Sequence, residues 1–298
     1  MTAPLEIDCV VDAHAKTGEG AFWDVERQCL WWVDIPAGIV HRHDPSTGGN
    51  HSHQLDEPVG CLAPTTKGDL LLATRSGFWR FDPETGEKTA LHDPEADRPA
   101  NRFNDGATDP KGRLWAGTMK DDGTSPAPDG AFYRLDTDLT STKWVDGIFT
   151  TNGLAFSPDG GTIYAADSNP SVQTIWAADY DVETGVPGER RTFFDARAVA
   201  GRPDGGTVDA DGCYWMAGVS GWQLVRLTPR GEIDRIVELP VERPSKPMFG
   251  GAGLDVLFVT SIGTGLSAGS EARQPNAGGL FAITGLGVQG LPQMRFAG

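Results

Sequence analysis

The sequence repeats one short pattern six times, and this repeat limits the possible folds more than any other feature. Each copy is a turn rich in Asp, Pro or Gly followed by an apolar run, and the copies are "DVERQCLWWVD", "TTKGDLLLATR", "DPKGRLWAGTM", "SPDGGTIYAAD", "DADGCYWMAGV" and "GGAGLDVLFVT". The equivalent positions are 40, 44, 49, 51 and 43 residues apart and are Leu30, Leu70, Leu114, Ile163, Tyr214 and Leu257. This spacing is typical of the blades of a β-propeller.

A second strand-like segment follows each run, as in "FWRFDPETG" and "GLFAITGLG". Short alternating segments of this kind predict strands and not helices. We therefore predict an all-β fold, a six-bladed β-propeller that residues 1–298 form as a single domain. The first unit begins too soon after the N-terminus to be complete, so "LEIDCVVD" is predicted to add a strand to the last blade and close the ring.

Composition excludes several classes of function. The chain of 298 residues has a net charge of −16, which disfavours nucleic acid and anionic membranes as partners. It has no apolar run of 18 residues, so no membrane span is predicted. The N-terminus has no basic segment followed by an apolar core, so we expect no secretory signal and a cytoplasmic protein. Its four cysteines lack a CxxC spacing and are expected to be reduced thiols.

Polar residues recur at one register of the repeat. Eleven or twelve positions before the second residue of each apolar run, the chain has Glu19, Val59, Asn104, Asn152, Asp204 and Lys246. The first strand of each propeller blade lies innermost, so residues just before these strands form a ring at one mouth of the channel. We therefore predict that Glu19, Asn104, Asn152 and Asp204 converge. A turn explains Asn, Asp or Gly before a single strand, but it does not explain four polar residues in one register.

A Gly follows the polar residue in "GEG", "TNG" and "PDG". Glycine permits a close approach of two backbones or a backbone conformation that a β-carbon forbids. Carboxylates that point into a shared cavity repel each other unless a cation or a proton lies between them. The register therefore predicts an assembled site and not a set of unrelated turns.

The chemistry of these residues indicates one divalent metal ion. Glu19, Asn152 and Asp204 offer only oxygen donors, which suit Ca²⁺, Mg²⁺ or Mn²⁺, with Zn²⁺ and Fe²⁺ as further possibilities. Three protein ligands leave open positions for water and substrate, as in catalytic metal sites. Such an ion polarises a carbonyl and acidifies a bound water, and a neighbouring carboxylate can act as general base.

The histidines and the other motifs do not suggest a competing site. His41, His43, His51 and His53 fall on an outer strand and its turn, and we interpret them as solvated surface residues. His14 precedes the first motif, close enough to line the mouth. The chain has no GxSxG motif and no P-loop, which disfavours an α/β-type serine hydrolase and a P-loop nucleotide-binding protein.

The ordered motifs "TGEGAFWD", "NRFNDGATDPKGRLWAGTM", "TNGLAFSPDGGTIYAADS", "RPDGGTVDADGCYWMA" and "KPMFGG" resemble those of the regucalcin and gluconolactonase family. The likeness covers nearly the whole chain. It implies a six-bladed propeller that hydrolyses a sugar lactone to the aldonic acid with a divalent metal. The metal ligands of the family match Glu19, Asn152 and Asp204, and Asp204 also matches its proton acceptor.

The resemblance implies further roles at the mouth. Arg102 and Asn104 match the residues that bind substrate, and Asp122, or its neighbour Asp121, matches an acid that contacts substrate in some members. The loop "KDDGTSPAPDG" that carries this acid is expected to act as a lid. Lys246 and Met248 occupy positions at which members of the family differ, which implies a part in substrate choice.

Three classes of function remain open from the sequence. The first is a metal-dependent sugar lactonase, a carboxylic-ester hydrolase of carbohydrate metabolism. The second is a regucalcin-like protein that binds Ca²⁺ without turnover, although Arg102 and Asn104 would then have no purpose. The third is a propeller that serves as an interaction platform, which predicts no convergent carboxylates. Within enzymes, a promiscuous esterase or organophosphate hydrolase is a further alternative.

Overall fold

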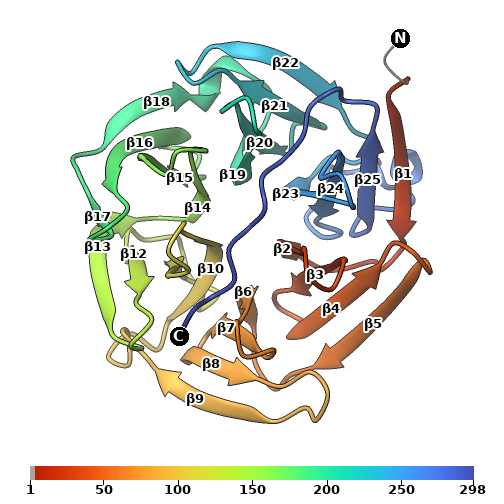
Figure 1. Ribbon diagram of the computed structural model, residues 1–298. Coiled ribbons are helices and arrows are strands. Elements are labelled where there is room, and N and C mark those ends of the chain that lie inside the picture. Colours follow the sequence, from red (N-terminus) through yellow and green to blue (C-terminus); the bar gives the residue numbers. More distant parts are fainter. Residues whose placement is uncertain (1–3) are drawn as a thin grey trace.

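The chain folds into six antiparallel sheets arranged around a central axis, as the computed structural model of residues 4–298 shows (Figure 1). The first blade contains β2 (Gly18–Asp24), β3 (Cys29–Asp34), β4 (Ile39–Asp44) and β5 (Gly49–Gln54). The second contains β6 (Val59–Pro64), β7 (Leu70–Thr74), β8 (Gly77–Phe81) and β9 (Lys88–His92). The third contains β10 (Asn101–Thr108), β11 (Leu114–Lys120), β12 (Gly130–Leu135) and β13 (Ser141–Ile148).

The other three blades follow the same order from the axis outward. The fourth contains β14 (Thr151–Phe156), β15 (Thr162–Asp167), β16 (Thr174–Asp181), the short β17 (Val186–Pro187) and β18 (Arg191–Asp195). The fifth contains β19 (Arg202–Val208), β20 (Tyr214–Val219), β21 (Gln223–Leu227) and β22 (Ile233–Glu238). The sixth contains β23 (Pro244–Gly250), β24 (Val256–Ser261), β25 (Leu280–Thr284) and β1 (Glu6–Val11). This arrangement confirms the all-β, six-bladed propeller.

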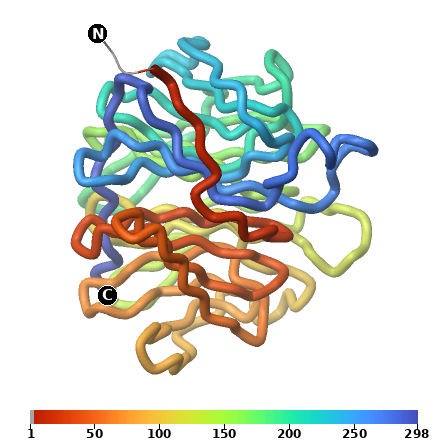
Figure 2. Tube along the Cα trace, turned by 90° about the vertical axis from the view of Figure 1, so that its right-hand side faces the viewer, coloured from red at the N-terminus to blue at the C-terminus, as the bar shows by residue number. Residues whose placement is uncertain are grey.

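The N-terminal strand closes the ring. Strand β1 pairs antiparallel with β25, from Glu6 opposite Thr284 to Val11 opposite Leu280. The last blade is thus built from both ends of the described chain, as the fragment "LEIDCVVD" predicted, and the side view shows β1 along the outside of this blade (Figure 2). Two single-turn 3₁₀ helices, Ala196–Ala198 and Glu271–Arg273, are the helical elements of residues 4–298. None of the helices is long and apolar enough to cross a membrane.

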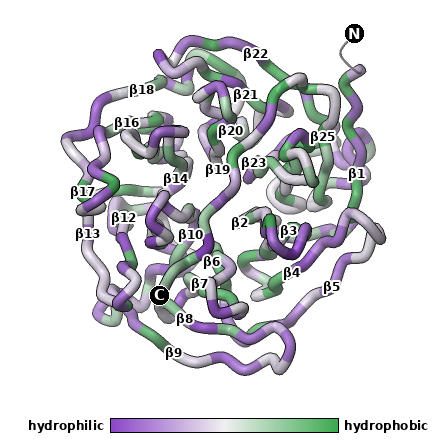
Figure 3. Tube along the Cα trace, viewed as in Figure 1, coloured by the Kyte–Doolittle hydropathy of each residue, from purple (hydrophilic) through white to green (hydrophobic). Residues whose placement is uncertain are grey.

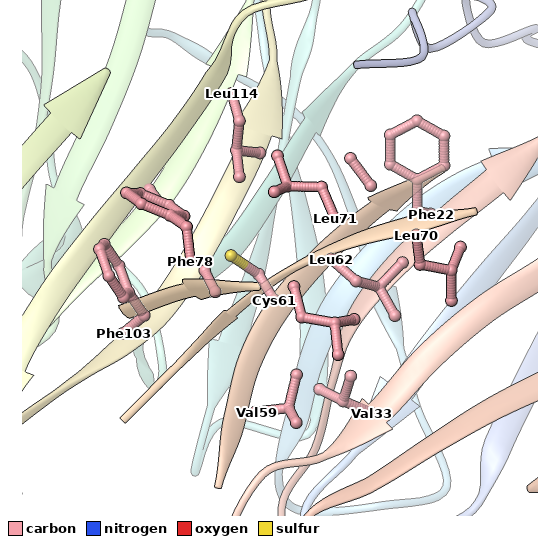
Figure 4. Close-up of a cluster of buried hydrophobic side chains, with 14 of the residues drawn as sticks. Phe22, Val33, Val59, Cys61, Leu62, Leu70, Leu71, Phe78, Phe103 and Leu114 are labelled. Carbon is pink, nitrogen blue, oxygen red and sulfur yellow. The ribbon is translucent and has the colours of Figure 1, made fainter. Parts of the chain in front are cut away.

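Apolar side chains fill the wedges between blades. Figure 4 shows one such cluster, in which Phe22 and Val33 of the first blade meet Leu62 and Phe78 of the second and Phe103 of the third. Inner strands are buried on both faces, whereas the residues of the outer strand β5 are half-buried or exposed, and this strand is drawn mostly in purple and white in Figure 3. The cysteines are free thiols, as expected, and three of the four are buried.

The C-terminal tail covers one end of the propeller. It leaves β25, crosses the face turned to the viewer in Figure 1, and reaches the second blade, where Phe296 bridges Thr65 and is buried. Beneath the tail lies a mostly apolar cavity of about 340 Å³, lined by Leu291 and Met294 of the tail and by Lys246 and Met248. The opposite end of the propeller, from which the loop between β11 and β12 projects, carries the polar residues of the predicted register (Figure 2).

The interpretation of the histidine tract as solvated surface is wrong for two of its four members. His41 and His43 are buried in β4, because alternate residues of this strand point toward the core. The His41 ring stacks on Trp32 at a centroid distance of 3.9 Å. Burial lowers the pKa of His41 to about 4 and also lowers the pKa of His43. His51 is exposed, as expected, and His14 is exposed beside Asp12.

His41 has a lower pKa in the folded chain than in the unfolded chain. Its full contribution to the unfolding free energy is therefore present above pH 6.5, where the imidazole is neutral in both states. This contribution is lost as the pH falls from 6.5 toward 4, since the unfolded chain then binds a proton that the folded chain does not. The variant His41→Phe keeps an aromatic ring on Trp32 but has no group that titrates. Between pH 6.5 and pH 4, we therefore expect the unfolding free energy of this variant to fall by about 2–3 kcal/mol less than that of the wild type. Denaturant unfolding at several pH values measures it. His51→Phe is the control, and an equal effect of both substitutions would contradict the assignment.

Candidate active site at the channel mouth

The predicted polar residues lie within the innermost strands and not before them. The pairing of each inner strand with its neighbour contains the register shift of a β-bulge, and in five of the six strands two consecutive residues stand unpaired there. Glu19 and Asn152 are the last paired residues before the bulges of β2 and β14. Asn104 and Asp204 are the first unpaired residues of the bulges in β10 and β19. A bulge bends its strand and redirects side chains, so these four side chains reach one cavity.

The glycines after these residues serve the two purposes that the sequence suggested. Gly20 and Gly153 have φ angles of +60° and +69°, a conformation that disfavours other residues. Gly205 instead permits a close approach, because a β-carbon there would lie 2.8 Å from the carbonyl oxygen of Ser245. Backbones of neighbouring blades therefore pack tightly around the axis, directly beside the polar residues.

The four predicted residues line one cavity of about 210 Å³ at the mouth of the channel. Asn104 and Asn152 form its amide side: the Asn104 Nδ2 donates to Asn152 Oδ1 at 3.1 Å and to the Thr151 carbonyl at 2.8 Å. The Asn152 Nδ2 donates to Ser168 Oγ at 2.6 Å, which fixes the Asn152 oxygen toward Asn104. An amide oxygen has two lone pairs, so Asn152 keeps one acceptor position for a further partner.

Glu19 and Asp204 form the acidic side of this mouth cavity. Glu19 is 3% exposed; its Oε2 accepts from the Gly20 amide at 2.8 Å, whereas its Oε1 is buried without a hydrogen-bond partner. Burial and the charges of Asp204 and Asp105 raise the pKa of Glu19 well above its usual range. Burial and the charge of Asp105 likewise raise the pKa of Asp204 to about 7. The ionised form of Glu19 is therefore destabilised by burial and by the charges of Asp204 and Asp105, and that of Asp204 by burial and by the charge of Asp105.

This donor set fits a divalent cation. A buried carboxylate oxygen without a donor is costly unless a cation or another polar group supplies the missing interaction. Two carboxylates and an amide oxygen are hard donors of the kind that Ca²⁺, Mg²⁺ and Mn²⁺ prefer. Residues 4–298 contain no cluster of three His, Cys, Asp or Glu side chains with metal-binding geometry. The set at the mouth differs in composition, because an asparagine is its third member.

Arg102 lines the same cavity and is held by three acceptors. Its Nε donates to Asp121 Oδ2 at 2.6 Å, and its Nη1 donates to Asn104 Oδ1 at 2.7 Å and to the Phe103 carbonyl at 2.9 Å. Asp121 also pairs with Arg75 at 3.3 Å. Of the two acids in the loop, Asp121 contacts the predicted site, whereas Asp122 is exposed and accepts hydrogen bonds from Thr124.

A buried ion pair that the sequence did not reveal lies close enough to the mouth to act on the charges of Glu19 and Asp204. Lys246 Nζ lies 2.7 Å from Asp105 Oδ1, and both side chains are at most 2% exposed. Asp105 Oδ2 accepts from the Leu154 amide at 2.8 Å. Both residues are the second member of a bulge, one in the third blade and one in the sixth, so they meet across the axis. Lys246 and Met248 line the cavity under the C-terminal tail and not the mouth, which does not support direct contact with substrate.

Sequence reasoning missed three residues of this region: Asp105, Arg202 and Arg243. Arg202 and Arg243 also line the mouth cavity, and their charges partly oppose the rise in the pKa of Asp204. The signal for Arg202 was present, because it precedes Asp204 by two residues as Arg102 precedes Asn104. Asp105 and Lys246 have opposite charges and occupy the same position in the bulges of their blades. The sequence does not reveal this, because the apolar pattern does not show where the bulges lie.

Comparison with known protein families supports the relationship that the motifs suggested. The model of the family described as "SMP-30/Gluconolactonase/LRE-like region" matches residues 17–263. Regucalcin of Xenopus laevis is 36% identical over 99% of both chains. The 6-deoxy-6-sulfogluconolactonase of Pseudomonas putida is 37% identical over 98% of this chain and 99% of its own length.

A solved structure gives the same result for the fold. The crystal structure of a calcium-binding protein, regucalcin of Agrobacterium tumefaciens, superposes with a TM-score of 0.91 at 28% identity. The match covers 99% of this chain and 97% of that one. The common fold therefore includes every blade and the closure by the N-terminal strand.

The ion pair across the axis predicts a large stability effect. Lys246→Met would leave the Asp105 carboxylate buried without its cation, and we expect it to lower the unfolding free energy by about 3–5 kcal/mol. The double variant Lys246→Met/Asp105→Asn should recover much of this loss, because no buried charge remains. Urea unfolding of the single and double variants measures both effects. Lys143→Met breaks an exposed pair with Asp146 and is the matched control. A loss at Lys246 no larger than that at Lys143 would exclude the proposed role.

Proposed function

Because this chain belongs to the SMP-30/gluconolactonase/LRE-like family, we propose that it is an enzyme that hydrolyses a sugar lactone to the aldonic acid. The observation that carries the proposal is the buried pair of acids Glu19 and Asp204, both with a raised pKa, at the mouth cavity beside Asn152. A propeller that served only as an interaction platform would not need to retain such a pair, because buried like charges lower its stability.

We assign one divalent metal ion to Glu19, Asn152 and Asp204. The free Oε1 of Glu19 supports this assignment, because it is a buried acceptor that lacks a donor. A bound divalent cation would polarise the lactone carbonyl and lower the barrier to attack by water. Calcium, zinc, manganese, magnesium and iron(II) all accept these donors, and the choice among them is a matter for measurement.

Asp204 is the proposed general base. Its carboxylate lies in the mouth cavity, and it would remove a proton from the water that attacks the carbonyl carbon. The bond between this carbon and the ring oxygen then breaks, and Asp204 returns the proton to the ring oxygen. A lactone is an activated ester, so water can attack it directly and the reaction needs no covalent nucleophile.

Arg102 and Asn104 are the proposed groups that orient the sugar ring. Arg102 is fixed by Asp121 and by the Asn104 amide oxygen, so its guanidinium holds one orientation without substrate. Such a preorganised pair of polar groups would bind ring hydroxyls at a low entropic cost. We assign the role of the loop acid to Asp121, because Asp122 points to solvent and Thr124.

The catalytic assignment is tested by replacing the base. We expect Asp204→Asn to lower kcat for acid release from a panel of aldonolactones by roughly 10²- to 10⁴-fold. Proton release at constant pH, corrected for spontaneous hydrolysis, measures the rate. Asp8→Asn changes an exposed acid of β1 and should keep full activity. Retention of full turnover by Asp204→Asn would refute the assignment.

The metal assignment is tested by stability in the absence of substrate. A cation at 100 times its Kd should raise the unfolding free energy of the wild type by about 2.7 kcal/mol, since it binds only the folded chain. We expect Glu19→Gln to lose most of this increase, because a neutral amide binds a cation weakly. Thermal unfolding with chelator and with each metal in turn measures the shift. Glu189→Gln is an exposed control, and an equal metal-dependent shift in both variants would contradict the ligand set.

A further inference from the structure

Two arginines at the mouth cavity have an unpaired Nε and form no ion pair among residues 4–298. Arg202 begins β19, and Arg243 lies directly before β23; both line the cavity that contains Glu19 and Asp204. The Nε of each guanidinium is buried without a hydrogen-bond partner. Within residues 4–298, neither side chain forms an ion pair with a carboxylate. Both therefore bring to the mouth a buried Nε donor without a hydrogen-bond partner, and the carboxylate of Asp204 interacts with both charges without forming an ion pair with either.

The equivalent arginine of the third blade shows what is missing. Arg102 pairs with Met119 of the neighbouring strand, as Arg202 pairs with Val219. Two residues after Met119 stands Asp121, whose carboxylate binds the Arg102 Nε at 2.6 Å. Two residues after Val219 stands Gly221, which has no side chain. The fifth blade thus presents a guanidinium at the position of Arg102 but without its counter-ion.

Arg243 is held in place by the backbone. Its Nη1 donates to the carbonyl oxygens of Thr264 and Gly265 at 2.6 and 3.0 Å. Carbonyl oxygens orient the guanidinium without cancelling its charge. Burial lowers the pKa of Arg243, the charges of Asp204 and Glu242 oppose this change, and the charge of Arg202 adds to it, so the two arginines are close enough to repel each other. An anion between them would relieve this repulsion.

The balance of charges at the mouth favours the binding of an anion. The charged residues that line the cavity are three arginines and two acids. Asp121 compensates Arg102, and a divalent cation on Glu19 and Asp204 would compensate those two acids. Arg202 and Arg243 then remain as two positive charges, in a chain whose net charge is −16. A neutral sugar offers hydroxyl groups to these arginines but no counter-charge.

We propose that Arg202 and Arg243 bind an anionic substituent of the substrate, a sulfonate, phosphate or carboxylate carried by the lactone. This inference rests on the proposed lactonase function and narrows its substrate class. All three substituents present several oxygens to guanidinium groups, which bind such anions by charge-assisted hydrogen bonds. The Nε of Arg202 would then donate a hydrogen bond to the anionic group of the substrate, as the Nε of Arg102 donates one to Asp121.

A second explanation is that both arginines only stabilise the ionised form of Asp204. The two explanations predict different ratios between the hydrolysis rates of anionic and neutral lactones. Loss of a charge that acts on Asp204 changes the hydrolysis of every lactone by the same factor, because all lactones use the same base. Loss of a charge that binds the substituent affects the anionic lactones selectively.

The experiment compares kcat/KM for glucono-1,5-lactone with kcat/KM for its 6-phosphate, its 6-sulfonate and a lactone of glucaric acid. We expect at least one anionic lactone to be preferred by tenfold or more over the neutral one. Arg202→Met and Arg243→Met should each reduce this preference at least tenfold, and Arg202→Lys should restore part of it. Arg230→Met is the matched control, because Arg230 lies exposed in the turn between β21 and β22. Equal kcat/KM for all lactones, or an equal loss for neutral and anionic lactones in the variants, would overturn the proposal.

Binding without turnover separates this proposal from the proposed function. Calorimetry on the metal-loaded protein compares gluconate with 6-phosphogluconate, the open-chain forms of two of the lactones. We expect 6-phosphogluconate to bind at least tenfold more tightly, with an affinity that falls as salt is added and falls in Arg202→Met. If no lactone is hydrolysed but this preference is present, the proposed function fails and the anion site stands. If lactones are hydrolysed and gluconate binds as tightly as 6-phosphogluconate, the anion site fails alone.

Discussion

The crowding of six inner strands around one axis is the constraint on which the rest of the structure depends. Pairing within each blade fixes the first strand of the blade at the centre, and closure of the ring by β1 keeps all six strands there. Side chains that point inward must share a narrow space, so each needs a partner of suitable size and charge. Bulges in the inner strands direct polar side chains into this space.

Electrostatics divides the channel into layers. The mouth contains two acids whose pKa values are raised by burial and by neighbouring carboxylates, which is unfavourable for their ionised forms unless a cation lies beside them. One layer deeper, Lys246 neutralises Asp105 across the axis, and beyond this pair the lining becomes mostly apolar beneath the C-terminal tail. The pair therefore separates a polar site from an apolar core. The mouth is thus the layer whose side-chain charges call for a charged ligand, whereas the charges of the layer below neutralise each other.

The arrangement also explains how repeated blades acquire different roles. Arg102 and Arg202 occupy the same position of their blades, but one has a carboxylate beside it and the other a glycine. Asn104 and Asp204 likewise share one bulge position with different chemistry. The repeat places equivalent residues of different blades around the same cavity. Differences of single residues between the blades then give each blade its own chemical role at that cavity.

The sequence by itself determined the number of blades, the strand that closes the ring and the four polar residues that converge. It could do so because blade spacing and apolar alternation are local properties, and circular symmetry converts them into proximity. Only the tertiary structure decided that these residues lie within bulged strands, that Asp121 and not Asp122 binds Arg102, and that His41 and His43 are buried. Those results depend on where each bulge lies and on which charges meet across the axis. Lys246 illustrates the limit. Its repeat position suggested a role at the mouth, but it is the second unpaired residue of its bulge, whereas Asn104 and Asp204 are the first, and its side chain pairs with Asp105.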